Sequence, residues 1–268
     1  MNNLCTLLFT IIWLRCCFAT RNNTCGAPSI INSIQPLLNV FSDSGLETKF
    51  NFTFHGNCSS TVPFAQFLAL HSLYNSTNGK YWTWRNSSRI RWDFTNWNIS
   101  HYPNPCDNWQ GIFCRSSTNH TVSDRSRYCN ISAILLGERN LKGSIPDSLS
   151  NLVGLEALNL PYNSITGFLP TQIGTLTNLF LLNLYNNSIS GSIVSELGLL
   201  SQLIFLNLGQ NRFRSSIPSE LGNLVNLVEL YLYNNALTGQ LPSQLSYLHQ
   251  LKGIRMQFLR LYISCHML

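Results

Sequence analysis

The segment LEALNLPYNSITGFLPTQIGTLTN, residues 155–178, decides the fold, because its pattern occurs in four further segments of 24 residues each. The five units follow one another without insertion and fill residues 131–250. Aliphatic side chains recur at unit positions 1, 4, 6, 11, 15, 19 and 22, with asparagine at position 9, glycine at 13 and proline at 16. Such a fixed period predicts a repeat architecture.

Each unit begins with LxxLxL, the alternation of a short strand whose leucines face a core. One unit cannot bury its own leucines, so the units must stack at roughly 4.8 Å per strand. We therefore predict an α/β solenoid, a right-handed superhelix with a parallel β-sheet on its concave side. Glycine and proline bend the return path of each coil. The position-9 asparagines are predicted to hydrogen-bond the backbone of neighbouring coils; they are Asn163, Asn187, Asn211 and Asn235.

The pattern LxxLxLxxNxLxGxIPxxLxxLxx resembles the plant-type leucine-rich repeat family. In that family the repeats mostly form extracellular recognition modules: receptor-kinase ectodomains, receptor-like proteins and secreted inhibitors of polygalacturonase. The resemblance implies a non-enzymatic protein that binds a protein, peptide or glycan through the concave face of the repeats. Three units depart from the pattern, with Arg139 in place of asparagine, Val194 in place of proline and Ser215 in place of glycine.

Residues 58–130 precede the repeats and have a different composition. Residues 61–74 have the spacing of an amphipathic helix, which Thr61 is suited to cap. Five of the six tryptophans of the chain follow within 28 residues. Their density fits a small irregular core of large rings, and a carbohydrate platform is the alternative.

The stretch NPCDNWQGIFC, residues 104–114, resembles the cysteine signature of the N-terminal cap of the same family. The resemblance implies that Cys106 and Cys114 bridge each other or neighbouring cysteines of the cap, with Cys58 and Cys129 as further partners. On this interpretation the stretch closes the open end of the stack. Here the spacing between the two cysteines is one residue longer than in the family pattern.

Features outside the cap and repeats indicate export. Residues 1–19 resemble a cleaved signal peptide around an apolar run too short to span a bilayer comfortably, and an uncleaved anchor is the alternative. Residues 20–57 form an extension without a recognised pattern, and residues 251–268 form a degenerate or truncated sixth repeat. We expect a secreted or extracellular protein with disulfide bonds. Nine sequons predict N-glycosylation, at Asn22, Asn51, Asn57, Asn75, Asn86, Asn98, Asn119, Asn130 and Asn186.

Charge and motifs argue against several other functions. The net charge is +6, but residues 131–250 hold only four basic residues against six acidic ones, and no basic cluster suited to nucleic acid occurs. The sequence contains no CxxC, HExxH, GxSxG, GxGxxG or P-loop motif. We expect no metal, no cofactor, no catalytic residue and no nucleic-acid partner.

The concave face is the first place to look for a ligand site. Side chains at unit positions 3, 5, 7 and 8 point outward between the inward leucines, and exposed aromatic rings beside amides are typical of contact patches. The predicted contacts are Tyr162, Asn183, Tyr185, Phe205, Asn207, Glu229, Tyr231 and Tyr233. Alternatively, the position-5 asparagines only pair with each other, and a glycan at Asn186 would obstruct part of this face.

Two other functions stay open. The chain can be part of the ectodomain of a membrane receptor, with a possible co-receptor as partner. It can also be a secreted carbohydrate-active enzyme that uses the tryptophan-rich cap, in which case Asp93 or Asp107 carries the reaction.

Overall fold

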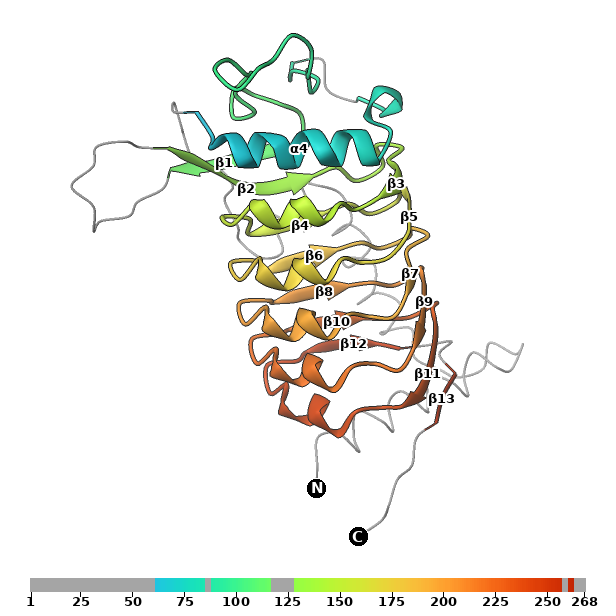
Figure 1. Ribbon diagram of the computed structural model, residues 1–268. Coiled ribbons are helices and arrows are strands. Elements are labelled where there is room, and N and C mark those ends of the chain that lie inside the picture. The colour runs from blue at the N-terminus through green and yellow to red at the C-terminus, as the bar shows by residue number, and fades with distance from the viewer. Residues whose placement is uncertain (1–60, 85–87, 117–127, 257–259, 263–268) are drawn as a thin grey trace, which may run out of the picture.

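The computed structural model describes residues 61–84, 88–116, 128–256 and the strand at 260–262. The predicted signal peptide, the extension at 20–57 and Cys58 lie outside these residues, as do the sequons at Asn22, Asn51, Asn57, Asn86 and Asn119. The described chain is a stack of coils beneath helix α4 (Phe64–Ser76), as Figure 1 shows.

A seven-stranded sheet runs along the whole stack in the order β1-β2-β4-β6-β8-β10-β12. Only β1 (Ile112–Ser116) is antiparallel to its neighbour; the later strands are parallel. The strands are β2 (Cys129–Leu135), β4 (Ala157–Asn159), β6 (Leu181–Asn183), β8 (Phe205–Asn207), β10 (Glu229–Tyr231) and β12 (Gly253–Arg255). Residues 24 apart pair directly, so each unit is one coil and the predicted register is confirmed.

The return path of each coil contains regular structure that the sequence did not reveal. A second column of short parallel strands lies along one side of the stack (Figure 1). These strands are β3 (Lys142–Ser144), β5 (Ser164–Thr166), β7 (Ser190–Gly191), β9 (Arg212–Ser215), β11 (Ala236–Gln240) and β13 (Arg260–Tyr262). One 3-10 turn follows in each coil: η3 (Asp147–Asn151), η4 (Thr171–Thr175), η5 (Ser195–Leu199), η6 (Ser219–Asn223) and η7 (Ser243–Tyr247).

Glycine and proline act at defined points of that return path. Gly143, Gly167, Gly191 and Gly239 all have positive φ, which suits glycine at position 13. In the fourth unit Ser215 takes φ 71° in place of glycine, an uncommon backbone for a residue with a side chain. Proline, or Val194 in the third unit, is the residue immediately before each 3-10 turn, so this replacement leaves the turn intact.

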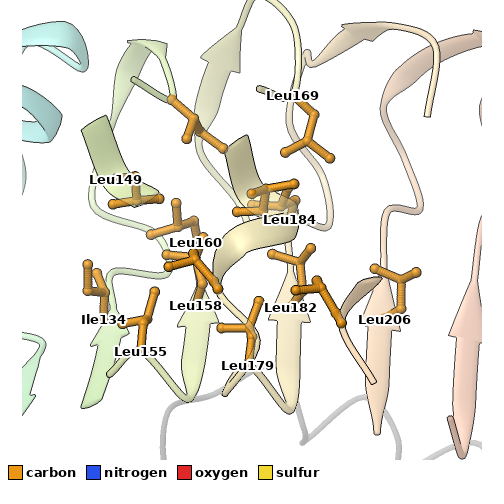
Figure 2. Close-up of a cluster of buried hydrophobic side chains, with 14 of the residues drawn as sticks. Ile134, Leu149, Leu155, Leu158, Leu160, Leu169, Leu179, Leu182, Leu184 and Leu206 are labelled. Atoms are coloured by element: carbon orange, nitrogen blue, oxygen red, sulfur yellow. The ribbon is translucent and has the colours of Figure 1, made fainter. Parts of the chain in front are cut away.

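The core is a continuous column of aliphatic side chains between the sheet and the 3-10 turns. Figure 2 shows Leu158, Leu182 and Leu206 from adjacent strands stacked in this column, and all three are fully buried. Burying such side chains contributes roughly 1.5–3 kcal/mol each relative to exposure. The stacking predicted from the LxxLxL pattern is confirmed.

The asparagines at position 9 tie each coil to the one before it. The Asn211 amide donates to the carbonyl of Leu184 at 2.8 Å, and its Oδ1 accepts from the backbone of Ile189 at 3.0 Å. Asn163, Asn187 and Asn235 make equivalent bonds. Backbone groups at the sharp turn after each strand are thereby satisfied although no strand pairs with them.

The cap is a compact aromatic core, not an exposed platform. Trp82, Trp92 and Trp109 are buried, with the Trp92 and Trp109 rings stacked at 5.7 Å. The indole N–H groups of Trp82 and Trp92 donate to backbone carbonyls at 3.0 and 2.8 Å. Helix α4 begins at Phe64 after Pro63, and Thr61 does not cap it; within the described residues no side-chain capping bond is present there.

A disulfide joins Cys106 to Cys114, one of the arrangements that the family resemblance implied. Cys129 is disulfide-bonded as well. Gly111 lies between Cys106 and Cys114 in the sequence and has φ 75°, and a side chain there would clash with the carbonyl of Leu135. The stretch at 104–114 therefore packs directly on the first coil.

Candidate functional site

The two faces of the main sheet carry different clusters. Strand β8 illustrates the alternation, since Leu206 belongs to the aliphatic column and Phe205 to a second apolar cluster. This second cluster, which we term the concave cluster, comprises Ala133, Leu135, Ala157, Leu181, Phe205 and Tyr231. Phe113, Phe180 and Tyr233 are partly buried against it.

The prediction that the eight contact residues are exposed is wrong for six of them. Asn183, Phe205 and Asn207 are 0–1% exposed, and Tyr185, Glu229 and Tyr231 are 7–8% exposed. Among the predicted contacts, only Tyr162 and Tyr233 are half-buried. Parallel strands bring side chains of adjacent units into contact, so residues at positions 3 and 5 pack on one another.

Five aromatic rings form a continuous band across the concave face. The Tyr162 ring lies perpendicular to that of Tyr185 at 5.1 Å, and Tyr185 lies 5.9 Å from Tyr233. Tyr231 connects the band to Phe205, with ring centroids 5.7 Å apart. Offset and perpendicular rings at these distances attract each other beyond simple burial. The structure thus brings together the aromatic residues that the sequence selected.

The hydroxyls of this band are held in their neutral form. Burial raises the pKa of Tyr162 to about 12, with Tyr185 as the next cause. Burial also raises the pKa values of Tyr185, Tyr231 and Tyr233, and the Glu229 carboxylate raises that of Tyr231 further. Tyrosine is already neutral near pH 7 at its ordinary pKa, and these shifts extend the neutral range of the band to higher pH.

Amide side chains at position 5 pair along the sheet only in part. Asn183 donates to Oδ1 of Asn159 at 2.8 Å, which agrees with the alternative that these asparagines pair with neighbours. Asn207 does not continue the series. Its Oδ1 accepts from the backbone of Gly209, whereas its buried Nδ2 donates to no acceptor among the described residues. A buried donor of this kind is uncommon and costs free energy while it is unpaired.

The next two residues at position 5 are Tyr231 and Arg255, and charged groups lie around the Tyr231 ring. Tyr231 donates to the carboxylate of Glu229 at 2.8 Å, and the guanidinium of Arg255 lies 5.6 Å from the Tyr231 ring. The repeat pattern does not single out Arg255, because the sixth unit lacks the position-9 asparagine. Extending the 24-residue register by one unit would have placed it beside Tyr231, where β12 pairs with β10.

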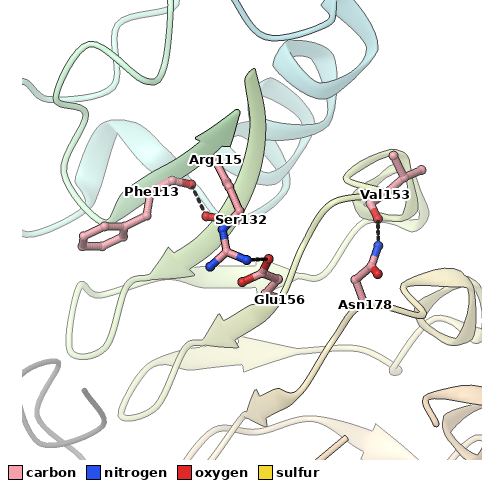
Figure 3. Close-up of polar contacts among 6 residues, drawn as sticks. All are labelled: Phe113, Arg115, Ser132, Val153, Glu156 and Asn178. Carbon is pink, nitrogen blue, oxygen red and sulfur yellow. Dashed lines mark hydrogen bonds and ion pairs between the residues drawn. The ribbon is translucent and has the colours of Figure 1, made fainter. Parts of the chain in front are cut away.

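Polar contacts at the first coils fix the cap to the repeats, as Figure 3 shows. Arg115 of β1 forms an ion pair with Glu156 of the second unit, and Ser132 donates to the carbonyl of Phe113 at 3.2 Å. Burial raises the pKa of Glu156, and Arg115 opposes that shift. One coil further on, the Asn178 amide donates to the carbonyl of Val153 at 2.8 Å. These contacts attach the first coils of the concave face to the cap.

The residues considered for carbohydrate chemistry in the cap are engaged locally. Asp93 accepts from the backbone and hydroxyl of Thr95 at 2.8 and 2.7 Å, and the bond from that hydroxyl is the main reason why the Asp93 pKa is lowered. Asp107 accepts from Asn104 at 3.1 Å. Both arrangements are local turns, and the packed tryptophan rings beside them do not form an open platform.

The part of the chain that the structure describes contains neither a metal-binding cluster nor a membrane-spanning helix. No three His, Cys, Asp or Glu side chains gather there as a metal site would require. Over the same residues, no helix has the length and apolar character needed to cross a bilayer.

Comparisons with known proteins agree with this geometry. The family model for the Leucine Rich Repeat matches residues 154–176, 202–224 and 226–248. A chain of the BIR3–SERK2 complex from Arabidopsis thaliana is similar, with 29% identity and a TM-score of 0.55 over 74% of this chain and 94% of that one. A sequence comparison with curated proteins gives no match.

Two further solved structures extend the comparison. The ectodomain of the receptor kinase SOBIR1 from Arabidopsis thaliana shares the fold, with 24% identity and a TM-score of 0.61 over 76% of this chain and 97% of that one. The ectodomain of the Arabidopsis receptor kinase HAESA, solved with a peptide hormone ligand, is 30% identical with a TM-score of 0.51. That match covers 60% of this chain and 25% of the HAESA ectodomain.

The fold, the register and these matches define a leucine-rich repeat protein. Its repeats are of the plant type: they are 24 residues long, and proline before the 3-10 turn and asparagine after the strand recur in most units.

Proposed function

We propose that this chain is an extracellular, non-enzymatic recognition module that binds a peptide or an extended segment of a protein on its concave face. The observation that carries the proposal is the combination of an aromatic band with a half-buried cation, Arg255, on one face. Peptide backbones offer carbonyl acceptors for the guanidinium donors, and aromatic and arginine side chains dominate binding energy at protein contacts.

Burial divides the predicted contacts into two roles. The half-buried Tyr233 and Arg255 contact the ligand directly, while Phe205 and Tyr231 form the floor that holds them in place. Such a rigid floor lowers the entropic cost of ordering the contact residues on binding. The solved complex of HAESA with its peptide hormone ligand supports the ligand class, since that ectodomain has the same repeat fold.

The test uses the full chain, secreted and immobilised, to capture partners from the extracellular fluid of the source tissue. Tyr233→Ala with Arg255→Ala removes two contacts from the concave face. Tyr247→Ala with Arg214→Ala is the matched control, because both residues are exposed and lie on other faces. The proposal expects any partner to bind the concave variant roughly 30-fold more weakly, as for a hot spot of about 2 kcal/mol. Equal weakening by both variants would contradict it.

A second candidate is that the chain belongs to the ectodomain of a membrane receptor, with a co-receptor as a further partner. The observation that favours it is the match to the BIR3–SERK2 complex, which covers nearly all of that solved chain. Transcript sequencing across the codon for Leu268 tests this candidate. A reading frame that continues into further repeats and an apolar segment of about 20 residues supports it, and a stop codon in every transcript rejects it.

A further inference from the structure

The four sequons within the described residues differ in what their asparagine side chains do. Asn98 is exposed, and its side-chain oxygen accepts the backbone N–H groups of Ser100 and His101. These bonds do not use the side-chain nitrogen. Asn75 is exposed at the end of helix α4, with its amide 3.0 Å from the ring of His71. An N-linked sugar is attached to the amide nitrogen, so that nitrogen must face solvent in the folded chain.

The sequon at Asn130 is built into the junction between the cap and the repeats. Asn130 Oδ1 accepts from Gln66 at 2.6 Å, and Gln66 in turn accepts from the backbone of Ile131. The Asn130 side chain also packs on Gly154, and Ser132, the third sequon residue, is buried. A sugar on Asn130 would break this junction.

The sequon at Asn186 has the opposite character. Asn186 occupies the left-handed backbone region, with φ 53°, at the rim where strand β6 ends. Its backbone N–H donates to Gly209, whereas its half-buried side chain makes no hydrogen bond with the described residues. Ser188, the third residue of this sequon, is also partly open to solvent. Asparagine tolerates this backbone better than most residues, so the position is stable without a side-chain partner.

Tyr162 is the equivalent of Asn186 in the preceding coil: both are at unit position 8, and Tyr162 has φ 54°. Adjacent coils are roughly 4.8 Å apart, so a sugar on Asn186 starts within contact distance of the Tyr162 ring. That ring lies against Tyr185, the residue before Asn186. The apolar face of a sugar ring packs on aromatic rings of this kind. Arg255 lies three coils further on, roughly 14 Å away and beyond the first sugar, and Phe205, one coil on, is buried.

We propose that Asn186 carries an N-linked glycan that packs on Tyr162 and covers the N-terminal half of the aromatic band, while Asn130 stays unmodified. The ligand then binds the half of the concave face that runs from Phe205 to Arg255. The location of the glycan is independent of the ligand, whereas the location of the ligand on the concave face rests on the proposed function.

Expression of the full chain through the secretory pathway of a eukaryotic cell tests the proposal. Enzymatic deglycosylation in heavy-oxygen water, followed by peptide mass spectrometry, marks each modified asparagine as labelled aspartate. We expect label at Asn186 and Asn98 and none at Asn130. An unlabelled Asn186 overturns the proposal, and label at Asn98 in the same sample shows that the chain was exported.

Packing of the glycan on the band is tested by hydroxyl-radical footprinting of Tyr162 in the glycosylated protein. Asn186→Gln should increase oxidation of Tyr162, whereas Asn98→Gln, the matched control, should not. Equal oxidation of Tyr162 in the two variants overturns the packing. Neither result depends on a ligand, so failure here is distinguishable from failure of the proposed function.

Discussion

Replacing Asn211 by alanine should destabilise the stack by about 3–5 kcal/mol. The Asn211 amide donates to the carbonyls of Leu184 and Leu208, and its oxygen is the acceptor for the Ile189 N–H. Leu184 keeps a second bond, from Asn187 at 3.1 Å, so its carbonyl is not left unpaired. The buried Ile189 N–H is left unpaired, which costs about 1–3 kcal/mol, and each lost bond to a carbonyl costs about 1 kcal/mol net.

The assay is urea unfolding followed by circular dichroism, with the change in free energy of unfolding as the measured quantity. Asn223→Ala in the same coil is the control, because Asn223 is exposed on η6, and we expect it to change stability by less than about 0.5 kcal/mol. If Asn211→Ala costs no more than Asn223→Ala, the turn after the strand does not depend on the asparagine and the reasoning is refuted.

Three further predictions concern the cap and the aromatic band. Gly143→Ala should cost about 2–4 kcal/mol by thermal unfolding, because the new methyl group would overlap the last carbonyl of helix α4; Gly167→Ala has positive φ but no such overlap and should cost about 1 kcal/mol. Replacing Cys106 and Cys114 together by serine removes their bridge, whose cysteines are eight residues apart, and should lower cap stability by about 2–3 kcal/mol, measured by tryptophan fluorescence in urea against the unaltered chain. The raised pKa of Tyr162 stabilises the fold fully below about pH 10, and this contribution is lost as pH rises through about 12; absorbance titration should lose one late-titrating tyrosine in Tyr162→Phe.

The repeats could be derived from the sequence because each relevant property recurs in at least four of the five units. Residues such as Leu182 and Asn187 have the same role as their equivalents in other coils, so a single physical argument fixes strand, core and turn together. The second column of strands was not foreseen, because residues such as Ser190 and Thr166 alternate too briefly to signal a strand. Their pairing follows from the stacking and not from local preference.

The concave face can be derived from the sequence only in part. The repeat pattern predicts which way each side chain points, but it does not predict how far that side chain is buried. Position 5 points away from the aliphatic column, as predicted, but Asn207 and Tyr231 are covered. Side-chain size across neighbouring units decides this, and no single unit contains that information. Arg255 was missed for a related reason: its unit loses the asparagine signal although its strand still pairs in register.

The direct pairing of residues 24 apart has a consequence for how such a chain can change over generations. Because every coil meets its neighbours through the same register and the same asparagine bonds, a whole unit can be duplicated or lost with few new contacts to optimise. Each such event lengthens or shortens the concave face by roughly 4.8 Å. The number of units therefore acts as a molecular ruler, and partner size can be selected by gene duplication before any contact residue is altered.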